Sequence, residues 1–380
     1  MKTVAVVGTS LAGLRAAQEL RSQGFDGELV LIGAEAHRPY DRPPLSKEFL
    51  LGKVSAADLA LADAEDLDAL QATWLLGAPA ISLSNGLIIL ANGRQVVADG
   101  VVIATGGTPK TLAGSAELTG VHTLRTLDDA VALRTALSAG PSSVVVIGAG
   151  FIGAEVASSC RLLGHDVTVV EALPVPLAGV LGEQLGAVCA ELHADNGVPV
   201  RTGTGVAGLV GTDRVTGVRL TDGTELPADL VVAGIGVRPV TEWLTGSGLA
   251  VDDGVLVDSG CVTADPRVVA IGDVARYWSR PRGRRVRSEH WTAATEQPAI
   301  AVRNLLAGST VAHYERPGYF WSDQYGCRIQ FAGTVTPQVR IVEGELAERK
   351  FVAAYVDGDA VVGVLALDSA RGFGKLRRGL

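Results

Sequence analysis

The sequence predicts a protein of the α/β class, because one pattern of strand, glycine-rich turn and helix occurs twice in the chain. The first copy begins with the apolar run at residues 4–7, and its turn contains Gly8 and Gly13. The second copy begins with the apolar run at residues 144–147. Its turn contains Gly148, Gly150 and Gly153. Strands and helices that alternate in this way form a parallel sheet with helices on its faces.

In each copy a second apolar strand ends beside an acidic residue. This residue is Glu35 in the first copy and Glu171 in the second, about twenty residues beyond the glycine turn, where dinucleotide-binding folds place an acid that binds ribose. One such fingerprint is a weak signal, but two in one chain imply two dinucleotides. A protein that binds two dinucleotides usually passes electrons from one to the other, so we expect an oxidoreductase.

A further repeat indicates a duplicated architecture. Residues 92–109 match residues 222–239 at a constant offset of 130 residues and without a gap. Each copy has a turn, a short strand and a buried strand that ends in a glycine turn. We therefore predict two Rossmann-like dinucleotide-binding domains, one of them discontinuous, each with a parallel core and an inserted β-meander.

The rest of the chain predicts a smaller third domain. Residues 254–258 and 268–273 are expected to form strands that return to the first domain, and residues 292–306 a helix. From about residue 313 strand-like segments dominate, which indicates a small C-terminal α+β domain. The predicted domains are residues 1–111 with 242–311, residues 112–241, and residues 312–380.

Composition argues against several classes of function. With 380 residues and a net charge of −8, the chain is not expected to bind nucleic acid. It has no apolar run of membrane-spanning length and no signal-peptide pattern, so we expect a cytoplasmic protein without membrane contact. The four cysteines are far apart and form no metal-ligand or dithiol pattern, so we expect no metal and buried, reduced thiols.

The glycine turns have a definite chemical use. A glycine turn at a strand end lets backbone N–H groups approach a pyrophosphate, and the positive end of the following helix dipole favours the negative charge. The second turn is complete, whereas the first has Ser10 at the middle glycine position. Serine is small, and its hydroxyl can face a phosphate. The alternative is a tight turn that binds no ligand. This alternative is stronger for the first copy taken alone than for the two copies together.

Glu171 indicates which nucleotide the second turn binds. A carboxylate at this position accepts hydrogen bonds from the adenosine ribose and repels a 2′-phosphate. Residues 172–177 contain no arginine or lysine that could bind such a phosphate. The pattern therefore favours NADH over NADPH, with an ordinary exposed acid at a strand end as the alternative.

These motifs together identify a family resemblance that covers essentially the whole chain. The most specific segments are Pro-Pro-Leu-Ser-Lys at residues 43–47 and Phe-Trp-Ser-Asp-Gln-Tyr at residues 320–325. The chain resembles the FAD-dependent, NADH-oxidising ferredoxin reductases that serve bacterial monooxygenases and ring-hydroxylating dioxygenases. These reductases belong to the glutathione-reductase-like flavoproteins, which bind two dinucleotides. Further matching segments lie at residues 38–42, 104–107, 150–155, 236–239 and 270–273.

The resemblance implies where both cofactors bind. The first predicted domain becomes the FAD-binding domain and the second the NAD-binding domain. The expected FAD contacts are Gly8, Leu11, Ala12, Gly13, Ala34, Glu35, Arg42, Lys47, Ala80, Thr105, Gly106, Arg125, Asp273 and Trp291. The expected NAD contacts are Gly148, Gly150, Ile152, Gly153, Glu171 and Gly236. Family members often have an acid at the position of Ala34, so Glu35 is the candidate to replace it at the ribose.

Two charged residues are expected to take part in catalysis. A fixed cation near N1 of a reduced flavin raises its reduction potential, and the resemblance places Lys47 by the flavin. Glu155 is a suitable partner that orients this cation and lowers its net field. Glu155 is expected in the first turn of a helix, so the alternative is that it only complements the helix dipole. For Lys47 the alternative is an ordinary lysine that faces solvent. Trp291 is expected to border the isoalloxazine ring, and Trp321 covers the flavin or belongs to a core between domains.

The resemblance implies a mechanism in two halves. NADH passes a hydride to FAD, and the reduced flavin passes single electrons to a [2Fe-2S] ferredoxin that feeds a monooxygenase or dioxygenase. The absence of a redox cysteine near Ser46 agrees with this branch of the flavoproteins. An acidic ferredoxin needs a basic docking face. The candidates are Arg276, Arg280, Arg282, Arg284, Arg285 and Arg287, although a solvated loop explains them equally well.

Other functions stay open at this point. A rubredoxin reductase or an NADH oxidase would use the same cofactors. A flavoprotein that senses NADH and acts by binding a partner predicts slow turnover. A flavin-free NAD-binding scaffold is favoured only by Ser10 and Ala34. Family members commonly continue beyond the position of Leu380, and the basic residues between 371 and 378 are a second candidate for the docking charge.

Overall fold

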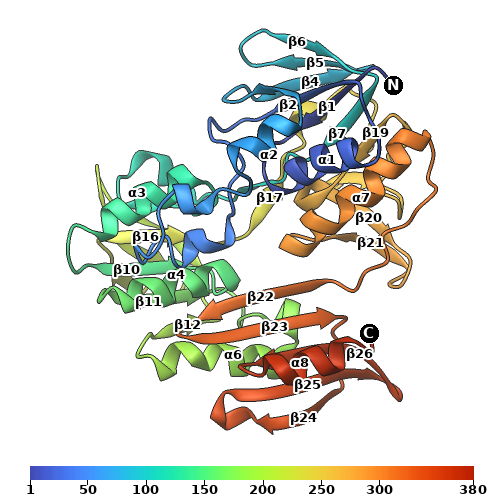
Figure 1. The fold of residues 1–380 in the computed structure, drawn as a ribbon. Helices are drawn as coiled ribbons and strands as arrows, with labels where there is room; N and C mark the ends of the chain where they lie inside the picture. Colours follow the sequence, from blue (N-terminus) through green and yellow to red (C-terminus); the bar gives the residue numbers. More distant parts are fainter. The chain divides into compact units, whose positions relative to one another are not determined.

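The computed structural model describes all residues from Met1 to Leu380, and contacts within it divide the chain into two compact units (Figure 1). Unit 1 consists of Met1–Asp41, Leu59–Thr108 and Arg238–Gly318. Unit 2 consists of Arg42–Asp58, Pro109–Val237 and Tyr319–Leu380. The borders of these units depend only on contacts within the chain. The three domains expected from the sequence, including the FAD-binding and NAD-binding domains, therefore stay a prediction. None of the helices is both long enough and apolar enough to cross a membrane.

The core of unit 1 is a parallel sheet of five strands in the order β19-β7-β1-β2-β3. Its strands are β1 (Thr3–Val7), β2 (Glu28–Ile32), β3 (Ala72–Leu75), β7 (Gly100–Ile103) and β19 (Val268–Ala270). The inner strands are nearly continuous apolar runs, as is usual for a parallel sheet that is covered on both faces. Strand β19 pairs with β7, which confirms that residues 268–273 return to the first sheet.

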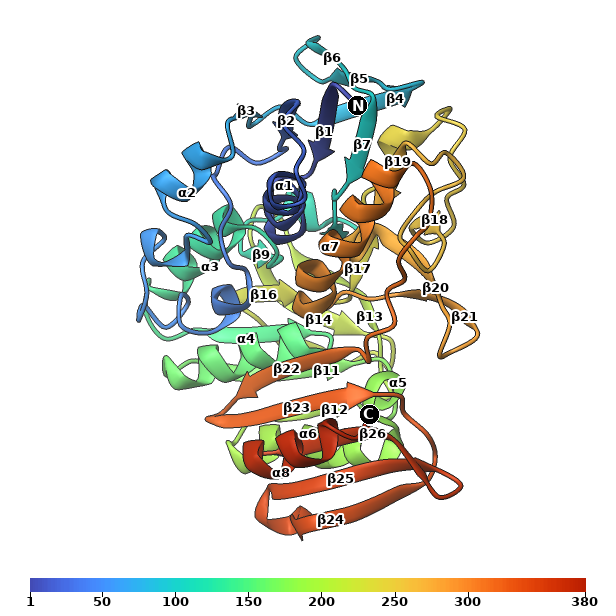
Figure 2. The same ribbon diagram turned by 45° about the vertical axis from the view of Figure 1, so that its right-hand side comes forward.

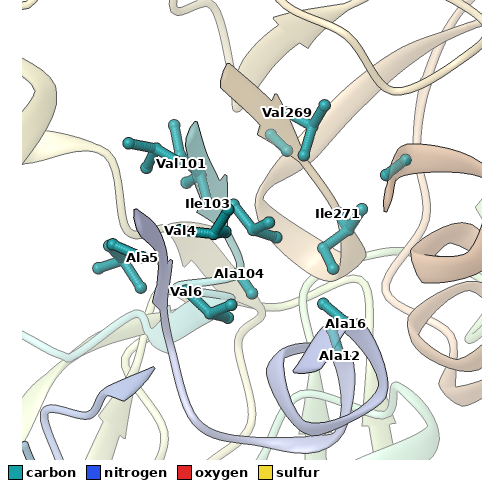
Figure 3. Packing of buried hydrophobic residues seen from close by; sticks show 14 of the residues in the cluster. Val4, Ala5, Val6, Ala12, Ala16, Val101, Ile103, Ala104, Val269 and Ile271 are labelled. Carbon is teal, nitrogen blue, oxygen red and sulfur yellow. The ribbon is translucent and has the colours of Figure 1, made fainter. Parts of the chain in front are cut away.

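Two helices of unit 1 pack together beside this sheet. They are α1 (Leu11–Ser22) and α7 (Trp291–Ala307), which lie side by side in both views (Figures 1 and 2). The close-up in Figure 3 shows Ala12 and Ala16 of α1 next to Ile271, which follows β19. Small side chains at these positions let α1 approach the ends of the strands closely. Helix α7 confirms the helix predicted for this part of the chain.

Unit 1 also contains two smaller sheets and the short helix α2 (Ala64–Ala69). One sheet is the meander of β4 (Ala80–Ser84), β5 (Leu87–Leu90) and β6 (Gln95–Val97). The other has the order β18-β20-β21, with β18 (Val255–Val257), β20 (Ala275–Ser279) and β21 (Arg284–Arg287). Strand β18 thus returns to unit 1 as expected, but it pairs with β20 and not with the parallel sheet.

Unit 2 repeats the parallel core, with five strands in the order β12-β11-β10-β16-β9. Its strands are β9 (Val121–His122), β10 (Ser143–Ile147), β11 (Asp166–Glu171), β12 (Val200–Thr202) and β16 (Leu230–Ala233). Val4 pairs with Gly100 in the first sheet, and Val144 pairs with Leu230 in the second, so β16 follows β7 by the predicted 130 residues. The predicted duplication and the α/β class are therefore confirmed.

Four helices and a second meander complete this part of unit 2. The helices are α3 (Leu127–Leu137), α4 (Phe151–Leu162), α5 (Ala178–Leu181) and α6 (Glu183–Asp195). The meander consists of β13 (Val206–Gly211), β14 (Val215–Leu220) and β15 (Glu225–Pro227). Two short strands, β8 (Gly107–Pro109) and β17 (Val237–Pro239), pair with each other, and a unit border falls within each of them.

The last part of unit 2 is an antiparallel sheet in the order β22-β23-β26-β25-β24. Its strands are β22 (Tyr319–Gln324), β23 (Cys327–Gly333), β24 (Val339–Glu345), β25 (Lys350–Asp357) and β26 (Ala360–Leu367). Helix α8 (Ala370–Arg377) packs on β26 (Figure 2). Strands β23, β24, β25 and β26 contain the segments whose sequences predict strands, at residues 328–331, 339–342, 351–356 and 361–367, whereas β22 was identified only as part of a family motif. Strand β22 contains Ser322, which donates a hydrogen bond to Glu155 of α4.

Candidate functional site

The first glycine turn is determined by sterics. Gly8 has a φ of +111°, and a Cβ at this position would lie 2.0 Å from the carbonyl oxygen of Ala104. A Cβ on Gly13 would lie 1.8 Å from the carbonyl oxygen of Gly8. Real Cβ atoms do not approach backbone oxygens so closely, so both positions require glycine. The turn therefore brings the ends of β1 and β7 and the start of α1 into direct contact.

The second glycine turn has the same geometry in unit 2. Gly148 has a φ of +98°, and its Cβ would lie 2.3 Å from the carbonyl oxygen of Gly234. A Cβ on Gly153 would lie 2.0 Å from the carbonyl oxygen of Gly148. Gly150, by contrast, faces open space within 4 Å of the position its Cβ would take. Gly148 and Gly153 are thus needed for the turn itself, while Gly150 leaves room for a ligand to approach the backbone.

The helices that follow both turns begin without a side-chain cap. Ser10 before α1 and Gly150 before α4 provide no side chain that accepts from the first-turn amides. Helix α3 shows the usual solution, in which Thr126 and Asp129 form a reciprocal capping box. Uncapped first-turn amides at a helix N-terminus bind a pyrophosphate well, because their N–H groups and the helix dipole both favour an anion. Both turns therefore fit a dinucleotide.

The acids at the strand ends are held differently in the two units. In unit 2, Glu171 accepts hydrogen bonds from the amides of Ala149 at 2.8 Å and Leu173 at 2.9 Å. Its carboxylate is thereby fixed beside the glycine turn. In unit 1, Glu35 accepts a hydrogen bond from the hydroxyl of Tyr40, and Ala34 next to it is exposed.

The other unit 1 residues of the expected FAD site follow the strands of one sheet. Thr105 and Gly106 follow β7, and Asp273 lies in a short 3-10 helix directly after β19. Because β1, β7 and β19 are parallel, their carboxyl ends meet at the edge that carries the Gly8 turn. Trp291 begins α7 and donates through Nε1 to Asp41 Oδ1 at 2.9 Å. Ala80 begins β4 in the meander.

A buried amide at this edge has an unused donor. Gln297 of α7 is fully buried, and its Oε1 accepts from the amide of Gly272 at 2.7 Å. Its Nε2 is buried without a hydrogen-bond partner. Buried donors in native proteins are nearly always satisfied, so this atom indicates a polar group that binds beside Asp273. Together with the uncapped helix α1, it shows that the residues present fit FAD.

The two expected catalytic residues form an ion pair within unit 2. Lys47 Nζ lies 2.9 Å from Glu155 Oε2, and the side chains of Lys47 and Glu155 are 12% and 7% exposed. Lys47 follows the 3-10 helix Pro43–Ser46, while Glu155 projects from α4. The lysine is therefore not a solvent-facing side chain. The expectation that Glu155 lies in the first helical turn is wrong, because α4 begins at Phe151 and has no acid in its first turn.

Two serine hydroxyl groups that were not predicted from the sequence hold this pair. Ser46 Oγ donates to Glu155 Oε2 at 2.5 Å, and Ser322 Oγ donates to Glu155 Oε1 at 2.7 Å. Both serines lie inside the two segments that carry the family resemblance, one beside Lys47 and the other beside Trp321. A buried serine next to a proposed site residue was the available signal, but only the fold brings residues 46, 155 and 322 together.

The remaining predicted residues divide between the units. Arg42 and Arg125, both expected on FAD, lie in unit 2, where Arg42 donates to the carbonyl oxygen of Arg125. Ile152 is a half-exposed residue of the first turn of α4, and Gly236 accepts a backbone hydrogen bond from Lys110. Trp321 stacks on Tyr319, with ring centroids 5.9 Å apart. Of the expected FAD contacts, Arg42, Lys47 and Arg125 belong to unit 2, and the others belong to unit 1.

Most arginines of the predicted docking face already have partners. The ion pairs are Arg276 with Asp252, Arg280 with Glu315, and Arg287 with Asp253 and Glu289. Arg285 donates to the carbonyl oxygen of Val257 at 2.6 Å, so it stabilises the sheet of β18, β20 and β21. Arg284 is exposed and forms no ion pair. On α8 and just after it, Arg371, Lys375 and Arg378 are also exposed without an ion pair.

The four cysteines are all free thiols. Cys160, Cys189 and Cys261 are buried, and burial raises the pKa of the Cys160 and Cys189 thiols to about 12. Cys327 is half-buried, and burial raises the pKa of its thiol to about 11. No group of three or more histidine, cysteine or acidic side chains is placed to bind a metal.

Comparison with known families and proteins agrees with this geometry. The family model for pyridine nucleotide-disulphide oxidoreductases matches residues 2–298, and the model for the reductase C-terminal domain matches residues 319–380. Putidaredoxin reductase of Pseudomonas putida is 39% identical over 372 residues, which cover 95% of this chain and 87% of the relative. The ferredoxin–NAD(+) reductase component of the anthranilate 1,2-dioxygenase system of Burkholderia cepacia is 38% identical over 387 residues, with 98% and 92% covered.

Solved structures give the same relationship. The reductase in the covalent complex of putidaredoxin reductase with putidaredoxin superposes with a TM-score of 0.93 at 34% identity, and the match covers 99% of this chain and 92% of that one. The ferredoxin reductase for the CYP199A2 system of Rhodopseudomonas palustris also gives a TM-score of 0.93, at 33% identity, with 100% and 95% covered. The chain belongs to the pyridine nucleotide-disulphide oxidoreductases, whose members bind FAD and NAD(P)H, and within them to the ferredoxin reductases of oxygenase systems.

Proposed function

We propose that this chain is a ferredoxin–NAD(+) reductase that takes electrons from NADH through FAD and delivers them singly to a [2Fe-2S] ferredoxin of an oxygenase system. The observation that carries the proposal is the pair of uncapped glycine turns, one in each unit. Two relatives add support, since their names describe reductases of putidaredoxin and of a dioxygenase ferredoxin. A cytoplasmic location stays a prediction from the sequence.

When bound, FAD accepts two electrons from the nicotinamide and releases them one at a time. Lys47 provides a cation whose position is fixed by Glu155. A fixed cation stabilises negative charge that develops beside it, and a paired carboxylate reduces that effect. The two residues together therefore set the field on the reduced flavin. The first turn of α1 binds the FAD pyrophosphate, and that of α4 binds the NADH pyrophosphate.

NADH is the proposed donor because of Glu171. Two backbone amides hold its carboxylate beside the turn, where it accepts from ribose hydroxyls and repels a 2′-phosphate. No arginine or lysine follows within residues 172–177. A 2′-phosphate would therefore meet a negative charge and no cation on this segment.

The ferredoxin is proposed to dock on exposed cations that lack an internal partner. Arg284 meets this condition on the β20–β21 hairpin, whereas Arg285 does not. Arg284→Gln is therefore the cleaner test. It should raise the KM for an acidic ferredoxin and leave flavin reduction by NADH unchanged, because rim charges mainly affect association. If Arg284→Gln slows flavin reduction and ferredoxin reduction equally, or slows neither, Arg284 is not a docking residue. Arg371, Lys375 and Arg378 would then be the remaining candidates.

The function is tested by anaerobic rapid mixing of the purified protein with NADH, and then with an oxidised [2Fe-2S] ferredoxin. Fast bleaching of the flavin followed by fast ferredoxin reduction is the expected result. The same mixing with NADPH tests the role of Glu171. Bleaching with a persistent long-wavelength band and no electron delivery would favour an NADH-sensing protein, and no bleaching with either nucleotide would contradict the proposal.

A further inference from the structure

We propose that Ser322 is a positioning residue that holds the Glu155 carboxylate toward Lys47. The inference rests on the proposed function, because it concerns the charge pair next to which FAD is proposed to bind. It adds a residue from the C-terminal sheet to a site otherwise built from the segment after Arg42 and from α4.

The hydrogen bonds give each oxygen of Glu155 its own partners. Oε2 accepts from Ser46 Oγ at 2.5 Å and from Lys47 Nζ at 2.9 Å. Oε1 accepts from Ser322 Oγ at 2.7 Å and from the amide of Asp323 at 3.3 Å. The β22 contacts therefore fix one oxygen, which leaves the other directed at Lys47.

The direction of the Ser322 hydrogen bond follows from its second neighbour. Gln324 Nε2 donates to Ser322 Oγ at 3.0 Å, so the oxygen of Ser322 is already an acceptor. Its single proton is then available to Glu155. Ser322 and Gln324 are 0% and 1% exposed, so water does not compete for this proton. A donor that is buried and oriented in this way restricts the rotation of the carboxylate more than a solvated one does.

Loss of this contact should change the charge pair rather than the fold. Without Ser322 Oγ, Oε1 keeps only the longer contact with the amide of Asp323, and the carboxylate can turn away from Lys47. The lysine then becomes more mobile and less compensated. A less compensated cation raises the reduction potential of a nearby flavin.

Helix α4 offers a matched control for this substitution. Ser158 Oγ accepts from the amide of Tyr325 at 2.7 Å and is 4% exposed. Ser158→Ala therefore removes a buried hydroxyl between the same helix and the same β22–β23 hairpin, but it does not touch Glu155. Any general loosening of this interface appears in both variants.

The experiment compares Ser322→Ala, Ser158→Ala, Ser322→Thr and Glu155→Gln with the unaltered holoenzyme. Two quantities are measured: the midpoint potential of the bound flavin, and the rate at which an amine-acylating reagent modifies Lys47, followed by peptide mass spectrometry. We expect Ser322→Ala to shift the potential upward, in the same direction as Glu155→Gln but less far, and to increase Lys47 acylation severalfold. Ser322→Thr keeps the hydroxyl and should restore both values, while Ser158→Ala should leave both unchanged.

The possible outcomes separate this proposal from the proposed function. If Ser322→Ala and Ser158→Ala give the same potential and the same acylation rate, Ser322 has only a structural role and the proposal is overturned. If Glu155→Gln leaves the flavin potential unchanged, the charge of Glu155 does not affect the flavin. This result also overturns the proposal for Ser322, but it leaves the proposed ferredoxin reduction intact. If NADH fails to reduce the unaltered protein, the proposed function fails, and Lys47 acylation still decides whether Ser322 holds the pair.

Discussion

The two glycine turns have the same backbone but hold their acids in different ways. In both, the first and last glycines are required because a Cβ would lie within 2.3 Å of a carbonyl oxygen. In unit 2 the amide of Ala149, inside the turn, binds Glu171, so the turn and the acid form one rigid element. In unit 1 the acid Glu35 binds a tyrosine hydroxyl instead, and the turn contains Ser10. Sterics thus preserve the turn, while the acids that are proposed to bind ribose are held by different partners.

The largest expected effect comes from replacing the last glycine of one turn at a time, where a Cβ would lie against a carbonyl oxygen of the same turn. Gly153→Val places side-chain carbons against the carbonyl oxygen of Gly148, so the start of α4 must move. We expect the affinity for NADH to fall by about tenfold or more, which corresponds to about 1.4 kcal/mol, while FAD stays bound. Gly13→Val should do the reverse and give protein depleted of FAD. The ratio of flavin to protein and an NADH titration measure both, and loss of FAD from Gly153→Val would contradict the assignment of the turns.

The next largest effect should come from Glu171. Glu171→Arg removes the acceptor of two amides and adds a cation where a 2′-phosphate would lie. We expect the ratio of kcat/KM for NADH over NADPH to fall by about 10–100-fold, because a charge-assisted hydrogen bond contributes about 1.5–3 kcal/mol. Glu225→Arg, at an exposed position of the meander in the same unit, is the control. An unchanged ratio would show that Glu171 does not recognise the ribose.

A smaller effect is expected at the acid of unit 1. Glu35→Gln weakens the acceptor of the Tyr40 hydroxyl, and Tyr40→Phe removes the donor. If Glu35 binds the FAD ribose while Tyr40 orients it, each change should weaken FAD binding by about three- to tenfold, and the double variant little further. Equilibrium dialysis of FAD against the three variants measures this. Additive losses would mean that the two residues contact FAD independently.

The smallest effect should follow Ser10→Gly, which makes the first turn like the second. The Ser10 side chain does not cap α1, so its loss removes no acceptor of a helix amide. We expect FAD affinity to change by less than about threefold, since surface-type substitutions usually stay within about 0.5 kcal/mol. A large loss would show that the Ser10 hydroxyl itself binds phosphate, and would make the two turns chemically different.

The sequence predicted the parts of the site that local pattern controls. Gly8, Gly148 and the strand-end acids follow from spacing, because a strand, a tight turn and a helix need little information from elsewhere in the chain. The duplication was equally visible in the sequence. The offset of 130 residues relates β7 to β16, and β16 pairs with β10 as β7 pairs with β1. Strand β18 was assigned to the correct unit, but its pairing with β20 was not predicted, because strand pairing depends on contacts that the local pattern does not contain.

The hydroxyl groups around Glu155 could not be predicted for the same reason. Ser46, Glu155 and Ser322 are separated by more than 100 residues from one another, and only packing brings them together. The arginines after Asp273 illustrate a different limit. Their density suggested either a basic docking face or a solvated loop, and acids from other loops, such as Asp252 and Glu315, pair with some of them. Charge counted along a sequence does not reveal which charges are already paired.

The order of strands in unit 1 has a consequence for synthesis on the ribosome. Strands β1, β2, β3 and β7 are complete once Ile103 has been made, but β19, which pairs with β7, ends at Ala270. Between these points the ribosome produces most of unit 2, including its own parallel sheet. During this interval β7 is an open edge strand with apolar side chains, a state that invites pairing with other chains. Nascent chains halted before Val268 should therefore aggregate or bind chaperones more readily than the finished protein.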